Sequence, residues 1–266
     1  MDTNRGRRDL FKVAGLMAAG SVIGSALPAA AAEKAAKTVF KVPQITVPIV
    51  GSKLHFPVRR INCIGFNYAA HAIEMGNDPT REPPVFFQKN TDAIQLVMPG
   101  TTVDNPYPPQ TKDYQYEVEL VVAIGKAGKD IPVSKALDHV FGYAVGLDMT
   151  RRDLQREMVN RKKPWEVAKS FDKAAPIGPI HPLSQTGHIK QGAIWLKVNG
   201  QLKQNADLNQ MIWTVAEQIS RLSTYSELMP GDIIYSGTPQ NVGPVVRGDL
   251  MEAHIDGLPN LLVKVV

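Results

Sequence analysis

The amino-acid sequence predicts one β-rich α+β domain. The chain has 266 residues, 44% of them hydrophobic, which suits a single core of moderate size. Short apolar and β-branched runs recur along it and are separated by turn signals, whereas few segments have the spacing of an amphipathic helix. Many short strands with few helices are typical of the α+β class.

The expected elements follow one another from residue 33 to the C-terminus. Residues 33–59 read as an extended arm with edge strands, because prolines interrupt the strand-like text. The main domain is expected to occupy residues 60–266. Its strands are expected at Arg60–Gly65, Tyr114–Gly125, Val140–Leu147, Ile194–Val198, Asp232–Ser236, Leu250–Ile255 and Leu261–Val266. Helices are expected at Tyr68–Met75, from Thr150 to about Asn160, and from about Met211 to Leu222.

Residues 1–32 have the plan of a signal peptide. Arg7 and Arg8 precede an uncharged stretch rich in Gly and Ala, and an Ala-x-Ala cleavage signal ends near Ala32. The paired arginines resemble a twin-arginine signal, so we expect the export machinery of that route as a partner and the periplasm as the destination. The alternative is a membrane anchor. The apolar stretch is too short and too rich in Gly and Ala for a stable span, so we expect no membrane insertion after the signal is removed.

The charge balance argues against a nucleic-acid partner. The formal charge is +5, but the first 32 residues hold four basic and two acidic side chains, which leaves +3 on the rest. The basic residues form no long run and do not alternate with aromatic residues. A mild positive balance favours a small anionic substrate.

Carboxylates in two apolar strands suggest a metal site. Glu117 and Glu119 are two residues apart in a strand, so their side chains point to one side about 7 Å apart. They would repel each other unless a cation lay between them, and Asp148 at the end of a second apolar strand could supply a third ligand. Cys63 is the only cysteine, so no cysteine cluster can hold a metal. An all-oxygen site suits Mg²⁺, Mn²⁺ or Ca²⁺, and the alternative is an exposed strand face with solvated carboxylates.

Six segments in order along the chain resemble one known family. They are NYAAHAIEMG (67–76), YEVELVVAIGK (116–126), GYAVGLDMTRRDLQ (142–155), AKSFDKAAPIGP (168–179), VNGQLKQ (198–204) and PGDIIYSGTPQNVGPV (230–245). Together they resemble the fumarylacetoacetate hydrolase family, and most closely its fumarylpyruvate and acylpyruvate hydrolase branch. The resemblance implies a mixed, β-roll-like fold of the family's C-terminal type and assembly as a homodimer.

The resemblance also assigns chemistry to particular residues. It implies that Glu117, Glu119 and Asp148 are the family's metal triad, usually filled by Mg²⁺ or Mn²⁺. His71 and Glu74 match a His-x-x-Glu pair on a short lid segment that acts on a water molecule. Residues three apart on a helix are neighbours, and a carboxylate beside an imidazole raises its basicity, although such a pair is more often an ordinary surface contact.

Further positions match residues that contact the substrate in the family. The resemblance assigns Lys169 to catalysis, and it assigns substrate binding to Arg152, Gln155, Lys89 and Thr238. For Arg152 the alternative is a solvated helix face. The family commonly has Arg or Leu where this chain has Phe66, so the resemblance leaves the exact substrate open.

The implied reaction is metal-dependent hydrolysis of a carbon–carbon bond in a small 2,4-dioxo acid, which gives pyruvate and a second acid. His71 and Glu74 would activate water, and Lys169 would neutralise the developing oxyanion. The same metal chemistry serves oxaloacetate decarboxylation or tautomerisation, which the residues do not separate from hydrolysis. A non-catalytic periplasmic binding protein is a third alternative, although passive chelation would need neither His71 nor Glu74.

Overall fold

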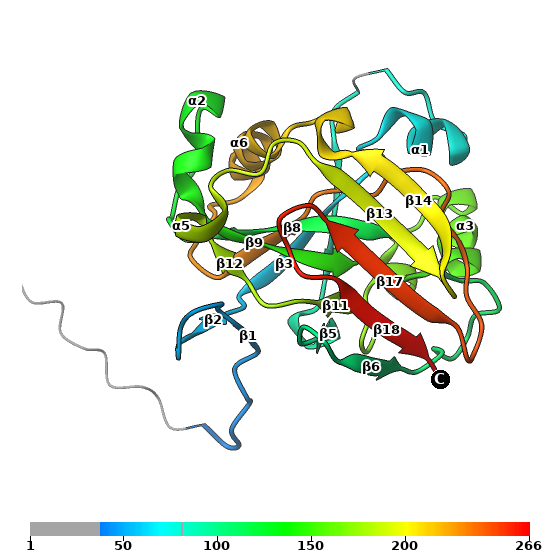
Figure 1. Cartoon of the computed structure of the whole chain (residues 1–266). Coiled ribbons are helices and arrows are strands. Elements are labelled where there is room, and N and C mark those ends of the chain that lie inside the picture. Colours follow the sequence, from blue (N-terminus) through cyan, green and yellow to red (C-terminus); the bar gives the residue numbers. More distant parts are fainter. Residues whose placement is uncertain (1–37, 81) are drawn as a thin grey trace, which may run out of the picture. The chain divides into compact units, whose positions relative to one another are not determined.

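The computed structural model describes residues 38–80 and 82–266, so the expected signal segment, residues 1–32, lies outside the described residues (Figure 1). By its internal contacts the chain divides into residues 1–42 and residues 43–266. The described part of the first unit, residues 38–42, forms neither helix nor strand. Within the described ranges, no helix combines the length and apolar character that crossing a membrane requires.

Residues 43–266 are built on two mixed β-sheets, as the α+β prediction requires (Figure 1). The larger sheet has the order β4 (Val85–Lys89), β3 (Arg60–Gly65), β15 (Asp232–Tyr235), β8 (Val118–Ile124), β9 (Val140–Leu147), β11 (Ala175–Ile177) and β5 (Ile94–Leu96), and β12 (His181–Pro182) also pairs with β9. The smaller sheet has the order β14 (Gln201–Asp207), β13 (Ala193–Val198), β17 (Leu250–Ile255), β18 (Leu261–Val265) and β6 (Thr102–Asn105).

Short pieces complete the domain. Two small sheets are formed by β10 (Thr150–Arg151), β7 (Tyr114–Tyr116) and β16 (Gly243–Pro244), and by β1 (Thr46–Pro48) with β2 (His55–Pro57). The helices are α1 (Ala69–Glu74), α2 (Val133–Ala136), α3 (Arg152–Asn160), α4 (Glu166–Lys169), α5 (Leu183–Thr186) and α6 (Val215–Tyr225), with 3₁₀ helices at Thr91–Ala93, Leu137–His139 and Leu208–Gln210. The β-rich prediction with few helices is confirmed.

Strand β8 is buried on both faces and divides the interior into two cores. Leu120 and Val122 point to the main core, which they share with side chains of the smaller sheet, including Leu196 of β13. Their neighbours Val121 and Ala123 point to the opposite side, into a second core that includes Val47 and Phe56 of the β1–β2 hairpin. A strand covered on both faces is expected to be apolar throughout, and β8 is apolar except for Glu119.

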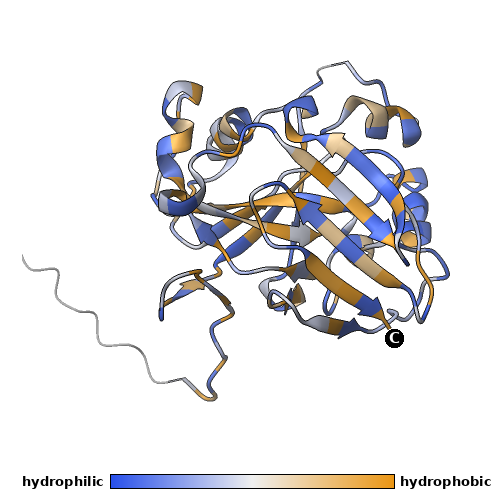
Figure 2. Cartoon of the chain, viewed as in Figure 1, coloured by the Kyte–Doolittle hydropathy of each residue, from blue (hydrophilic) through white to orange (hydrophobic). Residues whose placement is uncertain are grey.

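The smaller sheet is covered on one face only. Strands β13 and β17 alternate buried and partly exposed residues, and Figure 2 shows the same alternation in their hydropathy. Asn199 and Gly200, which join β13 to β14, both have positive φ angles, 51° and 78°, as a tight hairpin turn requires.

Three predicted strands have the predicted bounds, namely β3, β9 and β17, but the long strand expected at Tyr114–Gly125 is wrong. It breaks at Glu117 into β7 and β8. The break arises because β7 pairs with β10 and β16, whereas β8 continues between β9 and β15.

The helix expected from about Met211 begins instead at Val215 and continues to Tyr225. Its start is set by Thr214, whose side chain accepts the Glu217 N–H, while the Glu217 carboxylate accepts the Thr214 N–H. This reciprocal capping box fixes the first turn, so the helix cannot extend back to Met211 without losing it.

Candidate active site

Three carboxylates meet where β8 and β9 lie side by side. Glu117 is the residue between β7 and β8, Glu119 is the second residue of β8, and Asp148 directly follows β9. The Asp148 N–H donates to the Glu117 carbonyl at 2.9 Å, which holds the two strand ends together. Each residue offers an oxygen, and these oxygens lie within 4.8 Å of one another. All three residues are buried, at most 3% exposed, so they do not form the solvated face that was the alternative.

Positive side chains balance two of the three carboxylates. Lys169 Nζ lies 2.7 Å from Glu117 Oε2 and 2.9 Å from Asp148 Oδ2, and Arg152 also pairs with Glu117. Among the described residues no ion pair reaches Glu119. Burial alone would raise the pKa of Glu117, but the charges of Lys169 and Arg152 outweigh it and hold that pKa well below the usual range.

Glu119 is the carboxylate that most needs a cation. Its Oε2 accepts the Gly237 N–H at 2.8 Å. Burial, followed by repulsion from Asp148 and Glu117, raises the pKa of Glu119 well above its ordinary value. A divalent cation among the three groups would remove this penalty. The donor set fits a hard cation such as Mg²⁺ or Mn²⁺, because every ligand is an oxygen.

His71 and Glu74 form a fixed pair on α1. His71 Nδ1 lies 3.0 Å from Glu74 Oε2, and both Glu74 oxygens accept the N–H of Asn241, at 3.0 and 3.1 Å. The imidazole is only 4% exposed and lines the pocket, so the pair is not an ordinary surface contact. When Nδ1 donates to the carboxylate, Nε2 is the nitrogen that can accept a proton.

Arg152 and Gln155 project from the first turn of α3 into the same site. Arg152 is 1% exposed, so the alternative of a solvated helix face is wrong. Its guanidinium donates to Gln115 at 2.8 Å and to Gln155, in addition to Glu117. Both Arg152 and Gln155 line the pocket.

The loop after β15 brings Thr238 to the pocket. Gln204 on β14 donates to the Thr238 hydroxyl at 2.9 Å and to the Pro239 carbonyl at 2.7 Å. The same Gln204 side chain accepts the Val118 N–H at 3.0 Å, so one buried amide joins the loop to the start of β8. The role of Gln204 was not predicted, because the VNGQLKQ segment also contains Gln201 and nothing in it distinguishes the two glutamines.

Lys89 lies elsewhere than expected. Its ammonium lies 2.7 Å from Asp148 Oδ1 and donates to the carbonyls of Met149, at 3.1 Å, and Lys169. The side chain is fully buried and is not part of the pocket lining. Lys89 was expected to bind the substrate. In the structure it contacts the Asp148 carboxylate and two backbone carbonyls behind the pocket.

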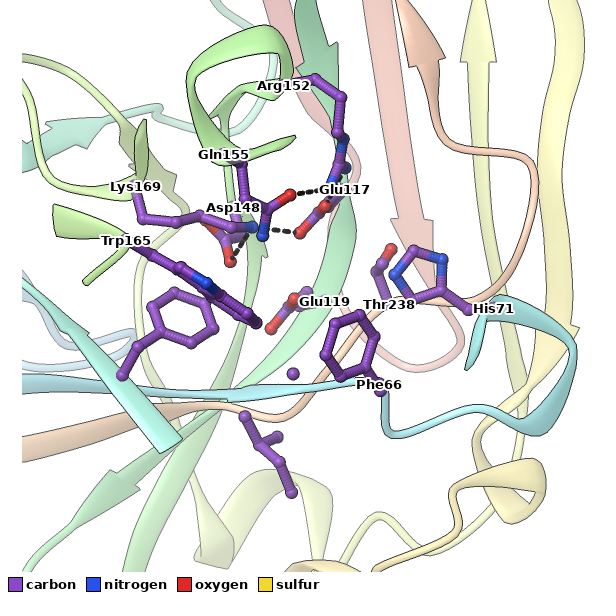
Figure 3. A pocket seen from close by; sticks show the side chains of 13 residues that line it. Phe66, His71, Glu117, Glu119, Asp148, Arg152, Gln155, Trp165, Lys169 and Thr238 are labelled. Carbon is purple, nitrogen blue, oxygen red and sulfur yellow. Dashed lines mark hydrogen bonds and ion pairs between the residues drawn. The ribbon is translucent and has the colours of Figure 1, made fainter. Parts of the chain in front are cut away.

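The pocket itself is small and has two kinds of wall (Figure 3). Its volume is about 10 Å³, roughly the space of one water molecule. In Figure 3, Arg152, Gln155 and Lys169 lie above Glu119, and the aromatic rings of Trp165 and Phe66 lie to its left and right. The aromatic wall was not predicted, because Phe66, Phe87 and Trp165 come from three separate segments that only the fold brings together.

Comparisons with known proteins agree with this geometry. The family described as fumarylacetoacetate (FAA) hydrolase C-terminal matches residues 60–266. A fumarylpyruvate hydrolase from a Ralstonia species is 43% identical over 71% of this chain and 95% of its own length. A mitochondrial oxaloacetate tautomerase from Arabidopsis thaliana is 39% identical over 75% of this chain and 87% of its own. The crystal structure of fumarylpyruvate hydrolase from Pseudomonas aeruginosa with Mn²⁺ and pyruvate has a TM-score of 0.85 and 54% identity, and the match covers 86% of this chain and 99% of that one.

Proposed function

The chain belongs to the fumarylacetoacetate hydrolase family, and we propose that it hydrolyses a carbon–carbon bond in a small 2,4-dioxo acid of the acylpyruvate or fumarylpyruvate type. Water adds to the C4 carbonyl, the C3–C4 bond breaks, and its electron pair remains on C3, which takes up a proton. The products are pyruvate and the acid of the acyl group. The observation that carries the proposal is a buried triad of carboxylates that shares one pocket with the His71–Glu74 pair.

A divalent cation held by Glu117, Glu119 and Asp148 would bind the 2-oxo acid end and withdraw electrons from its carbonyl. His71, oriented by Glu74, takes the proton from the attacking water. Burial alone would lower the pKa of Lys169, but the carboxylates of Asp148 and Glu117 outweigh it and raise that pKa, so the ammonium stays charged. Lys169 therefore neutralises negative charge on substrate oxygen and is not a base.

Arg152, Gln155 and Thr238 supply hydrogen bonds for the substrate carboxylate. All three line the pocket. Arg152 and Thr238 are each held by a buried glutamine, Gln115 and Gln204 respectively, so their donors are oriented before substrate arrives. Mn²⁺ or Mg²⁺ is the metal that the oxygen donor set favours, and the Mn²⁺ in the Pseudomonas relative supports the same choice.

A substrate panel tests the proposal. Acetylpyruvate, fumarylpyruvate and oxaloacetate are each incubated with the metal-free protein and then with Mn²⁺ added, and pyruvate is measured. We expect Mn²⁺-dependent pyruvate from the acylpyruvates, with equimolar acetate or fumarate. Pyruvate from oxaloacetate alone would contradict the hydrolase proposal.

Oxaloacetate tautomerisation or decarboxylation is the second candidate, and the oxaloacetate tautomerase relative from Arabidopsis favours it. Neither reaction adds water to a carbonyl. Loss of the water-activating role of His71 and Glu74 should therefore abolish acylpyruvate hydrolysis more completely than oxaloacetate turnover. Equal losses of both activities would remove this distinction. A non-catalytic binding protein is the least favoured alternative, and any metal-dependent turnover excludes it.

Export in the folded state is a separate proposal, and Arg7 with Arg8 motivates it. Both are changed to Lys in a bacterial host, and the periplasmic fraction is measured beside the unchanged chain. We expect the periplasmic fraction to fall sharply. Unchanged export would show that another route carries the protein.

Assembly as a homodimer is also proposed, from the family resemblance. Light scattering after gel filtration measures the mass directly, against 29.1 kDa for one chain of 266 residues. A monomer at micromolar concentration would contradict the proposal.

A further inference from the structure

Phe66 is the part of the aromatic wall nearest the proposed chemistry. Its ring centroid lies 6.3 Å from that of His71 with an angle of 29° between the planes, and it meets Trp165 edge to face at 5.6 Å. The ring therefore lies between the imidazole and the indole (Figure 3). If His71 activates the water that attacks C4, the acyl substituent on C4 must pass close to the Phe66 ring.

The backbone at Phe66 is held in an unfavourable conformation. Its φ angle is +59°, in the left-handed region that bulky side chains rarely occupy and that glycine adopts freely. The next residue, Asn67, fixes this conformation: its side chain donates to the carbonyls of Trp213, at 3.0 Å, and Ser236, at 2.8 Å, and accepts the Trp213 N–H at 2.8 Å. An aromatic side chain at a position where glycine would suit the backbone indicates a role for the ring.

Phe66 and Gly65 also separate two cavities. The reaction pocket holds about 10 Å³, which is too small for an acylpyruvate tail. A second cavity of about 160 Å³ shares Gly65 and Phe66 with it. Val85 and Ile212 also line this cavity, together with the exposed residues Asp78 and Glu82. An acyl tail must therefore extend beyond the reaction pocket, and Phe66 borders both that pocket and the second cavity.

We infer that Phe66 is a specificity-determining residue, which places the acyl tail of the substrate against its ring and toward the second cavity. The inference rests on the proposed hydrolase function. A flat, conjugated tail presents a π-face to Phe66 and Trp165 and has few rotamers to lose on binding. A saturated tail of the same length and charge has no such face and loses more freedom. The site therefore favours enoyl or aroyl groups over saturated acyl groups.

The test compares two substrates that differ only in this property. Fumarylpyruvate and succinylpyruvate have the same length and the same charges, but the fumaryl tail is flat and the succinyl tail is flexible. The ratio of their kcat/KM values is measured for the Mn²⁺-loaded wild type, Phe66→Leu, Phe66→Met and Phe66→Tyr. Leu and Met keep an apolar side chain without a ring, and Tyr keeps the ring.

We expect the fumaryl-to-succinyl ratio to fall about 3- to 10-fold in Phe66→Leu and Phe66→Met, the size of a lost aromatic contact, and to be retained in Phe66→Tyr. The Mn²⁺-induced rise in melting temperature, measured on each variant, confirms that the metal site is intact. An unchanged ratio in both ring-free variants, including one in which kcat/KM falls equally for both substrates, would overturn the inference. Failure of the proposed function would be seen differently, because the wild type would then release no pyruvate from either acylpyruvate.

Discussion

Changing Glu119 to Gln should stabilise the metal-free protein and weaken its stabilisation by Mn²⁺. The substitution removes one charge from the triad and keeps the size of the side chain. The amide oxygen of Gln can still accept the Gly237 N–H that Glu119 Oε2 accepts at 2.8 Å. The change in stability therefore reports the charge of Glu119, with little contribution from lost packing or a lost hydrogen bond.

The structure sets the size of the effect. The three carboxylates offer oxygens within 4.8 Å of one another. Two like charges at that distance repel by about 3.5 kcal/mol at an effective dielectric constant of about 20. The ammonium of Lys169 and the guanidinium of Arg152 offset part of this, and Glu119 can escape the rest by taking a proton. We therefore expect metal-free Glu119→Gln to be more stable than the wild type by about 1–3 kcal/mol at neutral pH.

The pH dependence has a definite sign. Burial first, then Asp148 and Glu117, raises the pKa of Glu119 in the folded protein. In the unfolded chain the pKa of Glu119 is about 4, and below that pH Glu119 is neutral in both the folded and the unfolded state, so it causes no repulsion. As pH rises above that value, Glu119 ionises more readily in the unfolded state than in the folded one. Metal-free wild type therefore loses stability until the pH reaches the raised pKa of Glu119 in the folded protein. Gln cannot ionise, so the advantage of the variant should grow over the same interval.

With metal the advantage of the variant shrinks by about 2.3 kcal/mol, because the two proteins respond differently to Mn²⁺. At Mn²⁺ one hundred times the wild-type Kd, the wild type gains about 2.7 kcal/mol, whereas a variant that binds one hundredfold more weakly gains about 0.4 kcal/mol. Thermal melts with chelator and with Mn²⁺ measure both effects, and Glu227→Gln, at an exposed position, is the matched control. Lower stability of metal-free Glu119→Gln together with a full Mn²⁺ response would refute the assignment of Glu119 to the metal.

Two further predictions address the catalytic pair and the sheet beneath the metal. His71→Ala and Glu74→Ala should each lower kcat by about 10²- to 10⁴-fold, and the double variant little more than the worse single one, because the two act as a unit; fully multiplicative losses with unchanged Mn²⁺ binding would show separate roles. Gly146→Ala should destabilise the protein by about 1–3 kcal/mol and weaken Mn²⁺ binding, because its Cβ would lie 2.6 Å from a methyl of Val121, opposite Glu119. Gly178→Ala, whose Cβ would meet its nearest atom at 3.8 Å, is the control for the melts, and equal melting temperatures for the two variants would contradict the clash.

Local sequence patterns predicted the features that depend on neighbouring residues. The β-branched run ending at Ile124 and the apolar run ending at Leu147 predicted β8 and β9, and the two-residue spacing of the glutamates predicted convergence on one side. The break at Glu117 was not predictable in the same way. It depends on β7 pairing with Gly243–Pro244, more than one hundred residues away, and no local pattern contains that pairing.

The two surprises in the site have the same origin. Lys89 is the last residue of β4, so its side chain could point to the pocket or behind it. Its contacts with Asp148 and with the carbonyls of Met149 and Lys169 hold it behind the pocket. The positive φ of Phe66 is imposed by the contacts of Asn67 with Trp213 and Ser236, far along the chain. Positions of this kind are set by tertiary contacts, which a single sequence does not display.

The burial of β8 on both faces bears on how long a metal ion would stay bound. Amide protons of a strand with a core on either side exchange only when the whole domain opens, so fraying of the sheet offers a bound ion no exit. Departure would have to follow the pocket, which His71 and Phe66 line, and His71 lies on α1, a single short helix. An ion loaded during folding should therefore have a residence time governed by that opening and not by the affinity of the carboxylates alone. A protein that is exported already folded, as we propose, could then carry its metal from one compartment to another.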